Sequence, residues 1–223
     1  MTADRMTVLS AMMDQGVIPV FYHPNDEVCK KVIQACANGG AKCVEFTNRG
    51  EFAAHVFYEV THYFAKADPS VIMGVGSVVD APTAGVYIAN GAKFVVGPLL
   101  NADIAKLCNR RKIPYSPGCG SPTEISYAEE LGCEIVKVFP GGSVGGPDFV
   151  KSVLGPCPWT RIMPTGGVDC SEESLSKWFK AGVACVGIGS NLITKQLLDA
   201  EDYAGIEKKV RETIALIRKI RGK

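Results

Sequence analysis

Short apolar runs recur at fairly even intervals along the chain, and segments with helical periodicity separate them. Near-continuous hydrophobicity, rather than strict alternation, is typical of strands that are buried on both faces. Eight runs are therefore predicted to be strands: residues 17–21, 41–46, 71–75, 93–96, 113–116, 134–139, 161–163 and 183–188. Helices are expected between them, among others at residues 25–38, 52–67, 102–110, 124–131 and 171–181.

Several of these predicted helices carry start and stop signals. Asn25 and Ser171 each precede acidic residues, as helix N-caps do. Gly182 follows the segment that begins near Ser171, in the position that favours glycine after a helix. The alternation of strands and helices is therefore supported by local signals as well as by periodicity.

Eight strands alternating with helices leave two main α/β architectures open. A doubly wound open sheet would carry a dinucleotide fingerprint, but Gly74-Val-Gly76 and Gly187-Ile-Gly189 both lack its third glycine. A (β/α)₈ TIM barrel is therefore preferred, as a single domain over residues 1–223. Residues 1–15 are expected to form an extra amphipathic helix that closes the bottom of the barrel, and residues 201–220 a C-terminal helix.

The composition narrows the class of protein. The chain has 223 residues, 47% of them hydrophobic and 21% charged, with a net charge of +1. This balance argues against a nucleic-acid binder and against disorder. No run approaches the ~20 apolar residues needed to span a membrane, and no secretory signal is expected. The nine cysteines contain no C-x-x-C pair, so buried, reduced thiols are expected rather than a metal site or disulfides.

In a barrel of parallel strands, the active site lies at the C-terminal ends of the strands. Lys137 is the most informative polar residue there, because the rest of its predicted strand is apolar after the first residue. Burial and a nearby cation such as Arg49 would both lower a lysine pKa, and a neutral amine beside a carbonyl can form a Schiff base. The alternative is a lysine that reaches water or an acid.

Glu45 ends another apolar predicted strand. A carboxyl in a poorly hydrated pocket has a raised pKa, which suits proton transfer. The alternative is an ion pair with Arg49 or Lys42, although a paired carboxylate can still transfer protons through a water.

Two glycine-rich loops follow the last two predicted strands. They contain Gly166 and Gly167, and Gly189 and Ser190. Converging backbone N–H groups bind anions, and loops after strands 7 and 8 hold phosphate in many barrels. The alternative is a pair of tight turns.

A possible metal arrangement lies elsewhere. His55, Glu59 and His62 share one face of a predicted helix, but that helix lies away from the strand ends. We therefore predict no metal site.

The assembled motifs resemble the 2-keto-3-deoxy-6-phosphogluconate (KDPG) aldolase / 4-hydroxy-2-oxoglutarate (KHG) aldolase family, class I aldolases with a barrel fold. The similarity extends along nearly the whole chain. Lys-x-Phe-Pro and Pro-Thr-Gly-Gly on successive strands are its most specific part. The matching segments are residues 17–20, 45–49, 74–78, 117–118, 137–140, 164–167 and 189–190.

The resemblance implies a role for each matching position. Lys137 would form the Schiff base, and Glu45 would be the general acid and base. The pyruvate carboxylate would bind Arg49, Ser77 and Thr165, and the phosphate would bind Gly166, Gly167, Gly189 and Ser190. Pro98 and Phe139 would form the pocket wall. The resemblance also implies a cytoplasmic homotrimer of the Entner–Doudoroff pathway with no metal or organic cofactor, no nucleic-acid partner and no membrane partner.

Several positions depart from the family pattern: Asn48, Gly50, Gly141-Gly142-Ser143 and Asn191. These positions leave the imine chemistry intact but concern the distal half of the substrate. The expected reaction is cleavage of KDPG to pyruvate and glyceraldehyde 3-phosphate. A substrate such as 4-hydroxy-2-oxoglutarate or a related 2-keto-3-deoxy sugar acid is the alternative. A non-catalytic barrel that binds a phosphorylated ligand is a third reading, because fold does not fix function.

Overall fold

The strands of the computed structural model, which describes residues 3–222, form a curled sheet in which every pairing is parallel. Six strands are hydrogen-bonded in the order β5-β4-β3-β2-β1-β9 and three in the order β6-β7-β8. The strands are β1 (Val17–Phe21), β2 (Cys43–Thr47), β3 (Ile72–Gly76), β4 (Phe94–Val96), β5 (Tyr115–Ser116), β6 (Gly118–Cys119), β7 (Val136–Val138), β8 (Ile162–Pro164) and β9 (Val186–Ile188).

The two hydrogen-bonded groups follow one another around a barrel-like wall. Only Pro117, which has no backbone N–H to donate, separates β5 from β6. On the other side, a bridge between Thr165 and Gly187 connects the end of β8 to β9. The predicted α/β class with a parallel, barrel-like sheet is confirmed.

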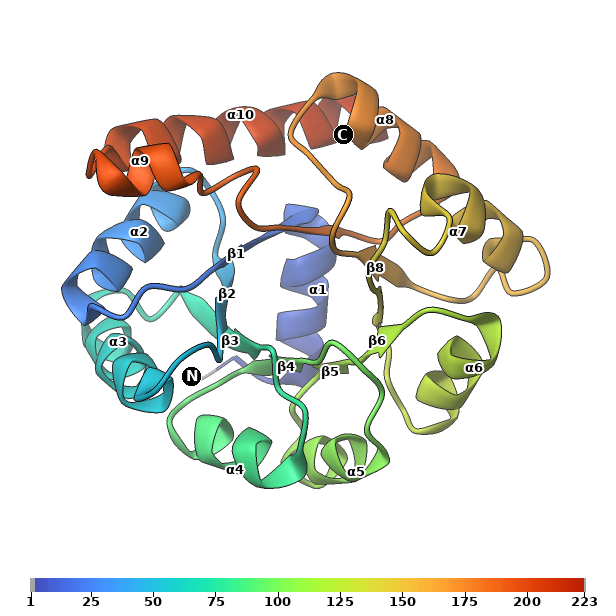
Figure 1. Cartoon of the computed structure of the whole chain (residues 1–223), viewed down its shortest axis with the longest axis horizontal. Helices are drawn as coiled ribbons and strands as arrows, with labels where there is room; N and C mark the ends of the chain where they lie inside the picture. Colours follow the sequence, from blue (N-terminus) through green and yellow to red (C-terminus); the bar gives the residue numbers. More distant parts are fainter. Residues whose placement is uncertain (1–2, 223) are drawn as a thin grey trace.

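Helices surround this wall as an outer ring (Figure 1). They pack the larger apolar cluster of the protein between themselves and the strands. The helices are α1 (Arg5–Gln15), α2 (Asp26–Asn38), α3 (Ala53–Ala67), α4 (Ala81–Ala89), α5 (Ala102–Arg111), α6 (Pro122–Glu130), α7 (Gly146–Leu154), α8 (Glu172–Ala181), α9 (Lys195–Asp199) and α10 (Tyr203–Arg221).

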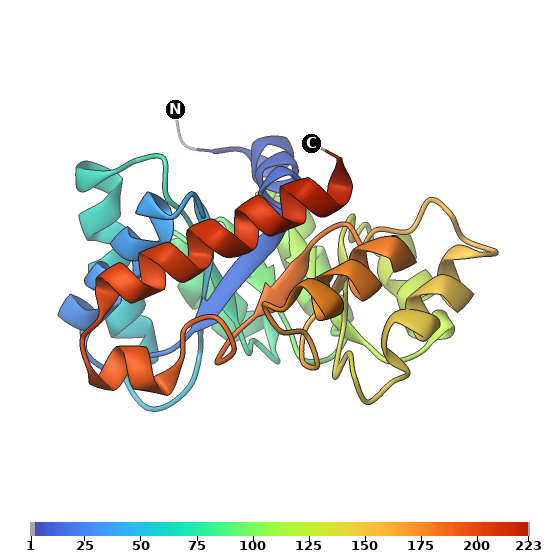
Figure 2. The same cartoon turned by 90° about the horizontal axis from the view of Figure 1, so that it is seen from above.

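Helix α1 lies across one end of the barrel, at the centre of the view in Figure 1. Its Val8, Leu9 and Met12 are buried against side chains inside the sheet, including those of Phe94 and Met163. The Gln15 side chain donates to the carbonyls of Val17 and Cys43 and accepts from the Cys43 N–H. This end of the barrel is therefore filled, while α9 lies at the opposite end (Figure 2).

The predicted strands and helices are observed to within about two residues, apart from strands that begin later than predicted, and β6 was not predicted. Residues 183–185 and 134–135, for example, precede β9 and β7. The predicted N-terminal segment is helical from Arg5 to Gln15, and residues 1 and 2 lie outside the described residues. The N-caps at Asn25 and Ser171 are present, since their side chains accept from Val28 N–H and Ser174 N–H.

Two findings concern the predictions about membrane spans and cysteines. Within residues 3–222, no helix is both long and apolar enough to cross a membrane. All nine cysteines are free; seven are buried, and Cys157 and Cys170 are partly buried.

Candidate active site

A cavity of about 580 Å³ opens at the C-terminal ends of the strands. Residues that follow β1, β2, β7, β8 and β9 line it, together with part of α9. They are Val20, Phe21, Tyr22, His23, Thr47, Arg49, Phe139, Thr165, Gly166, Gly167, Val168, Gly187, Gly189, Ser190, Asn191, Ile193, Lys195, Leu198 and Asp199. The glycine-rich loops and Arg49 thus meet at one opening, as the strand-end argument predicts.

Lys137 lies in the centre of β7, paired in register with Gly118 of β6 and Met163 of β8. Its side chain is only 5% exposed, and its Nζ is 4.7 Å from the centre of the Phe139 ring. It has no ion-pair partner within 4.0 Å among the described residues. Burial lowers the pKa of Lys137, the positive charge of Arg49 lowers it further, and Glu45 opposes both. The amine is therefore poised to lose its proton.

Glu45 is 1% exposed on β2, and its Oε2 has no hydrogen-bond partner among the described residues. Its carboxylate fits over Gly76 of β3, where a Cβ would overlap Oε1. Burial raises the pKa of Glu45, while the charges of Lys137 and Arg49 lower it. The expected alternative of an ion pair with Arg49 or Lys42 is not present at 4.0 Å among residues 3–222.

Lys137 and Glu45 interact electrostatically from β7 and β2, and burial moves both toward their neutral forms. Both are buried just below the cavity, whose lining includes Phe139 and Thr47, two residues further along the chain from each. An amine without its proton is a nucleophile, and a carboxyl with a raised pKa can give and take protons. A buried amine and a buried carboxyl of this kind are suited to nucleophilic attack and proton transfer.

Arg49 lines the cavity two residues after the end of β2. Its preceding residue, Asn48, accepts a hydrogen bond of 2.7 Å from the hydroxyl of Tyr87, which is 1% exposed on α4. The Asn48 N–H donates to the Gly76 carbonyl and the Arg49 N–H to the Thr47 carbonyl. These bonds fix the backbone that carries Arg49, so the departure from the family pattern at Asn48 has a structural role.

Thr165 and Ser77, the other residues expected at the carboxylate, differ in their positions. Thr165 lines the cavity, and its buried Oγ1 has no partner among the described residues. That hydroxyl lies over Gly187, where a Cβ would come within 2.5 Å of it. Ser77 follows β3 in the left-handed conformation, with φ of 60°, and is not among the residues that line the cavity.

The loop after β8 is built on positive φ angles of 80° at both Gly166 and Gly167. Their N–H groups, and those of Gly189 and Ser190, donate to no backbone carbonyl among the described residues. Free N–H groups on neighbouring loops are suited to an anion.

The loop after β7 supports the loop after β8 through its backbone. Gly141 N–H donates to the Thr165 carbonyl and Gly142 N–H to the Gly166 carbonyl, both at 2.9 Å. A Cβ on Gly167 would lie 2.7 Å from the Gly142 Cα. The two loops can approach this closely only because both positions are glycine. The loop after β9 is connected to the loop after β8 as well, because the Asn191 Nδ2 donates a hydrogen bond to the Val168 carbonyl.

The structure thus brings together most of the predicted site residues. Lys137 and Glu45 are buried and are not among the residues that line the cavity. Ser77 and Pro98 do not line it either, and the Pro98 carbonyl packs against Gly118. Sequence reasoning missed Tyr22, His23 and Lys195, which do line the cavity. For Tyr22 and His23 a signal existed, because they directly follow β1 and so belong to the strand ends.

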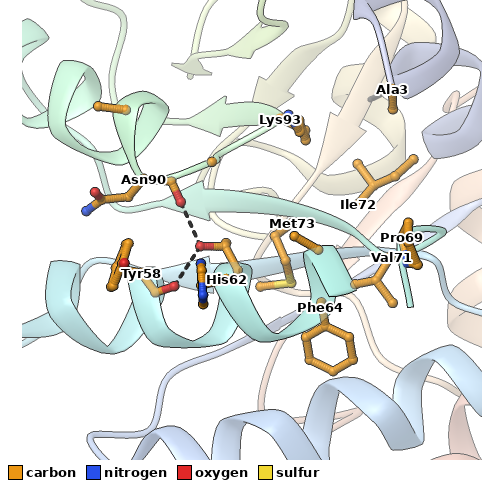
Figure 3. A pocket seen from close by; sticks show the side chains of 14 residues that line it. Ala3, Tyr58, His62, Phe64, Pro69, Val71, Ile72, Met73, Asn90 and Lys93 are labelled. Carbon is orange, nitrogen blue, oxygen red and sulfur yellow. Dashed lines mark hydrogen bonds between the residues drawn. The ribbon is translucent and has the colours of Figure 1, made fainter. Parts of the chain in front are cut away.

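A second cavity, of about 500 Å³, lies at the opposite end of the barrel (Figure 3). It is lined by the start of β3, the second half of α3 and the residues around Asn90. The Thr61 hydroxyl on α3 joins two of its walls by donating to the Asn90 carbonyl at 2.6 Å. His62 lines it, but residues 3–222 contain no group of three or more His, Cys, Asp or Glu placed to hold a metal ion.

Three comparisons agree on the relationships of the chain. Residues 8–209 match the family model described as KDPG and KHG aldolase. A 2-dehydro-3-deoxy-phosphogluconate aldolase of Haemophilus influenzae is 30% identical over 211 residues, covering 95% of this chain and 97% of that protein. Its counterpart in Pseudomonas aeruginosa is 31% identical over 199 residues, covering 89% of this chain and 87% of that protein.

Solved structures show the same fold. The 2-keto-3-deoxy-6-phosphogluconate aldolase of Zymomonas mobilis has a TM-score of 0.81 and 26% identity, over 96% of this chain and 98% of that one. The KDPG aldolase of Legionella pneumophila, with pyruvate captured as a covalent carbinolamine, has a TM-score of 0.83 and 24% identity, over 95% of this chain and 98% of that one. The resemblance deduced from the motifs is confirmed, and the chain belongs to the KDPG and KHG aldolase family.

Proposed function

We propose that this protein is a class I aldolase that cleaves KDPG to pyruvate and glyceraldehyde 3-phosphate through a Schiff base on Lys137. The observation that carries the proposal is the buried amine of Lys137, which has a lowered pKa and no ion-pair partner among the described residues, together with the buried carboxyl of Glu45. The names of the relatives, and the covalent carbinolamine captured in the Legionella enzyme, support the same chemistry.

The reaction begins when the neutral Nζ of Lys137 adds to the C2 carbonyl of the keto acid. The nitrogen then carries one proton too many, which passes to the carbonyl oxygen, and a neutral carbinolamine with a hydroxyl at C2 results. Glu45, in its protonated form, gives a proton to that hydroxyl, which leaves as water, and the protonated imine forms. The raised pKa of Glu45 makes the protonated form available.

The protonated imine then withdraws electrons from the C3–C4 bond. Glu45, now ionised, takes the proton of the C4 hydroxyl, directly or through a water. The C3–C4 bond breaks, its electron pair forms the enamine, and the aldehyde departs. Protonation of the enamine at C3 and hydrolysis of the imine release pyruvate and restore Lys137.

Two sets of residues are proposed to bind the two ends of the substrate, the carboxylate and the phosphate. Arg49 and Thr165 line the cavity. Together with Ser77, they are proposed to hold the pyruvate carboxylate. The phosphate is proposed to accept hydrogen bonds from Gly166, Gly167, Gly189 and Ser190. Phe139 covers the amine of Lys137 and forms an apolar wall, to which Pro98 is proposed to contribute.

Borohydride reduction in the presence of pyruvate tests the proposal. The full chain should gain a covalent mass on the peptide that contains Lys137, and Lys137→Ala should lose both this adduct and turnover. Lys180→Ala, which removes an exposed lysine of α8, is the matched control and should retain both. Absence of the adduct, or full turnover in Lys137→Ala, would refute the proposal.

The terminal group of the substrate is a separate question. The backbone N–H groups of the two glycine loops can receive a carboxylate as well as a phosphate. Comparison of kcat/KM for KDPG and 4-hydroxy-2-oxoglutarate therefore tests the substrate within the same mechanism, and we expect the higher value for KDPG.

The proposal includes the finer architecture: one domain over residues 1–223, a closed (β/α)₈ barrel, and α1 as an extra helix that fills its lower end. Support comes from the Thr165–Gly187 bridge and from the burial of Met12 inside the sheet.

The proposal also includes a cytoplasmic homotrimer. The free thiols support the cytoplasmic location, because they are typical of a reducing compartment. Large apolar side chains exposed around α4, those of Val79, Val86 and Leu99, fit an interface between subunits.

A further inference from the structure

Tyr22 is the first residue after β1. The order of the strands places this residue between the two proposed binding regions of the substrate. Strand β1 lies between β2 and β9. Strand β2 contains Glu45 and is followed by Arg49, and β9 is followed by Gly189 and Ser190. Val20 is in register with Glu45, and Pro19 with Ile188. A substrate that extends from the carboxylate-binding arginine to the anion loop after β9 therefore passes over the end of β1.

The phenol of Tyr22 is held in place from two sides. Its ring packs on the buried Phe46 ring, with centres 5.5 Å apart and planes inclined by 58°. Its hydroxyl lies over Gly50, where a Cβ would come within 2.9 Å of the oxygen. Gly50 has a φ of 84°, which other residues rarely adopt. The absence of a side chain at Gly50 therefore leaves the space that the Tyr22 hydroxyl occupies.

The Tyr22 hydroxyl differs from the other phenol of this region, that of Tyr87, in having no hydrogen-bond partner within residues 3–222. The hydroxyl of Tyr87 is committed to Asn48, whereas that of Tyr22 makes no hydrogen bond with another described residue. Tyr22 lines the cavity and is only partly buried. Its O–H can thus serve as a donor or an acceptor to a bound molecule.

His23 adds a second polar group from the same loop. Its Nδ1 accepts a hydrogen bond from the Asn25 N–H at 3.1 Å, so in the neutral ring the proton lies on Nε2. His23 also lines the cavity. The loop after β1 therefore offers two hydrogen-bonding side chains between two regions suited to anions.

From this placement we infer that Tyr22 is a specificity-determining residue whose hydroxyl binds a hydroxyl of the substrate between the cleaved bond and the terminal anion. The inference rests on the proposed function and narrows its substrate class. It favours polyhydroxylated 2-keto acids, whose aldehyde product carries a hydroxyl next to the aldehyde carbon. A dicarboxylic keto acid such as 4-hydroxy-2-oxoglutarate has no hydroxyl there.

The aldol reaction run in the direction of condensation tests this inference. Pyruvate is offered with glyceraldehyde 3-phosphate, or with 3-oxopropyl phosphate, which has the same length and phosphate but lacks the hydroxyl. Tyr22→Phe keeps the ring on Phe46 and removes only the oxygen. Because a neutral hydrogen bond contributes about 1 kcal/mol, kcat/KM for glyceraldehyde 3-phosphate should fall about fivefold, while that for 3-oxopropyl phosphate stays the same.

Gly50→Ala is the second variant, because its Cβ displaces the Tyr22 hydroxyl without changing the tyrosine. Like Tyr22→Phe, it should lower the ratio of kcat/KM for glyceraldehyde 3-phosphate to kcat/KM for 3-oxopropyl phosphate. Tyr127→Phe, an exposed tyrosine on α6, is the matched control and should leave the ratio unchanged.

The borohydride adduct of each variant with pyruvate separates this inference from the proposed function. If the unaltered protein forms no adduct on Lys137, the proposed function fails. If the adduct forms and Tyr22→Phe lowers kcat/KM for both aldehydes equally, or for neither, the inference about Tyr22 is overturned while the aldolase stands.

Discussion

Gly76→Ala addresses the placement of the catalytic carboxyl without altering any group that reacts. A Cβ at this position would overlap Glu45 Oε1 and lie 2.6 Å from Cδ and 3.0 Å from Cγ. Ordinary contact requires more than about 3.4 Å, so the carboxyl must move by about 1 Å or more. Gly76 ends β3 and is paired with Thr47 of β2. Because this pairing holds the backbone of Gly76 in place, the clash is relieved by movement of the Glu45 carboxyl.

Two magnitudes follow from this displacement. Overpacking of a filled interior costs about 1–3 kcal/mol in the free energy of unfolding. A misplacement of about 1 Å in a catalytic group can lower kcat about 100-fold. We therefore expect Gly76→Ala to fold with a lower Tm and to cleave KDPG about 100-fold more slowly.

The assay compares kcat for pyruvate release with the denaturant midpoint of the same samples. Gly74→Ala is the matched control on the same strand, because its Cβ would overlap the Phe94 ring in the lower core. It should lose stability but keep most of kcat when measured on folded protein.

A double variant tests whether the effect acts through Glu45. If it does, Gly76→Ala added to Glu45→Ala should slow the reaction no further, because the displaced group is already gone. Full kcat in Gly76→Ala would refute the reasoning, and so would a double variant about 100-fold slower than Glu45→Ala.

The remaining predictions concern charge, the anion loop and stability. Glu45→Gln removes the negative charge that raises the pKa of Lys137, so the pH profile of borohydride trapping with pyruvate should shift to lower pH; a shift to higher pH would contradict this. Gly167→Ala places a Cβ 2.7 Å from the Gly142 Cα at a φ of 80°, with a strain of about 1–3 kcal/mol, so KM for KDPG should rise while trapping of pyruvate persists. An unchanged KM would argue against the anion loop. Asn101→Ala removes the N-cap of α5 at a cost of about 1 kcal/mol, which should lower Tm by about 2–4 °C and leave kcat unaltered.

The strands other than β6, and the burial of Lys137 and Glu45 within them, could be predicted from the sequence for a common reason. Parallel strands end at one edge, so a polar residue in an apolar strand, such as Lys137 or Glu45, is placed at the cavity by topology alone. Helices α4 and α7 were not singled out, because Pro82 and Gly85 lie within the first and the second begins at Gly146-Pro147.

Contacts between distant segments could not be predicted. Asn48 meets Tyr87 across 39 positions of sequence, and nothing local in either residue specifies that hydrogen bond. Tyr22 directly follows the apolar run of β1 and resembles a core aromatic in the sequence. The position of its hydroxyl becomes visible only once Gly50 is placed beside it. The role of Gly76 likewise depends on a side chain from the neighbouring strand.

The contact between Gly142 and Gly167 has a consequence for how such an enzyme can diverge. The segment that follows β7 and the segment that follows β8, which is proposed to bind the phosphate, are joined backbone to backbone by hydrogen bonds of 2.9 Å, with no side chain between them. A replacement in either segment must be absorbed by the other. New selectivity for the far end of the substrate is therefore easier to evolve by exchanging residues after β1 or in α9, which border the same opening but are free of this constraint.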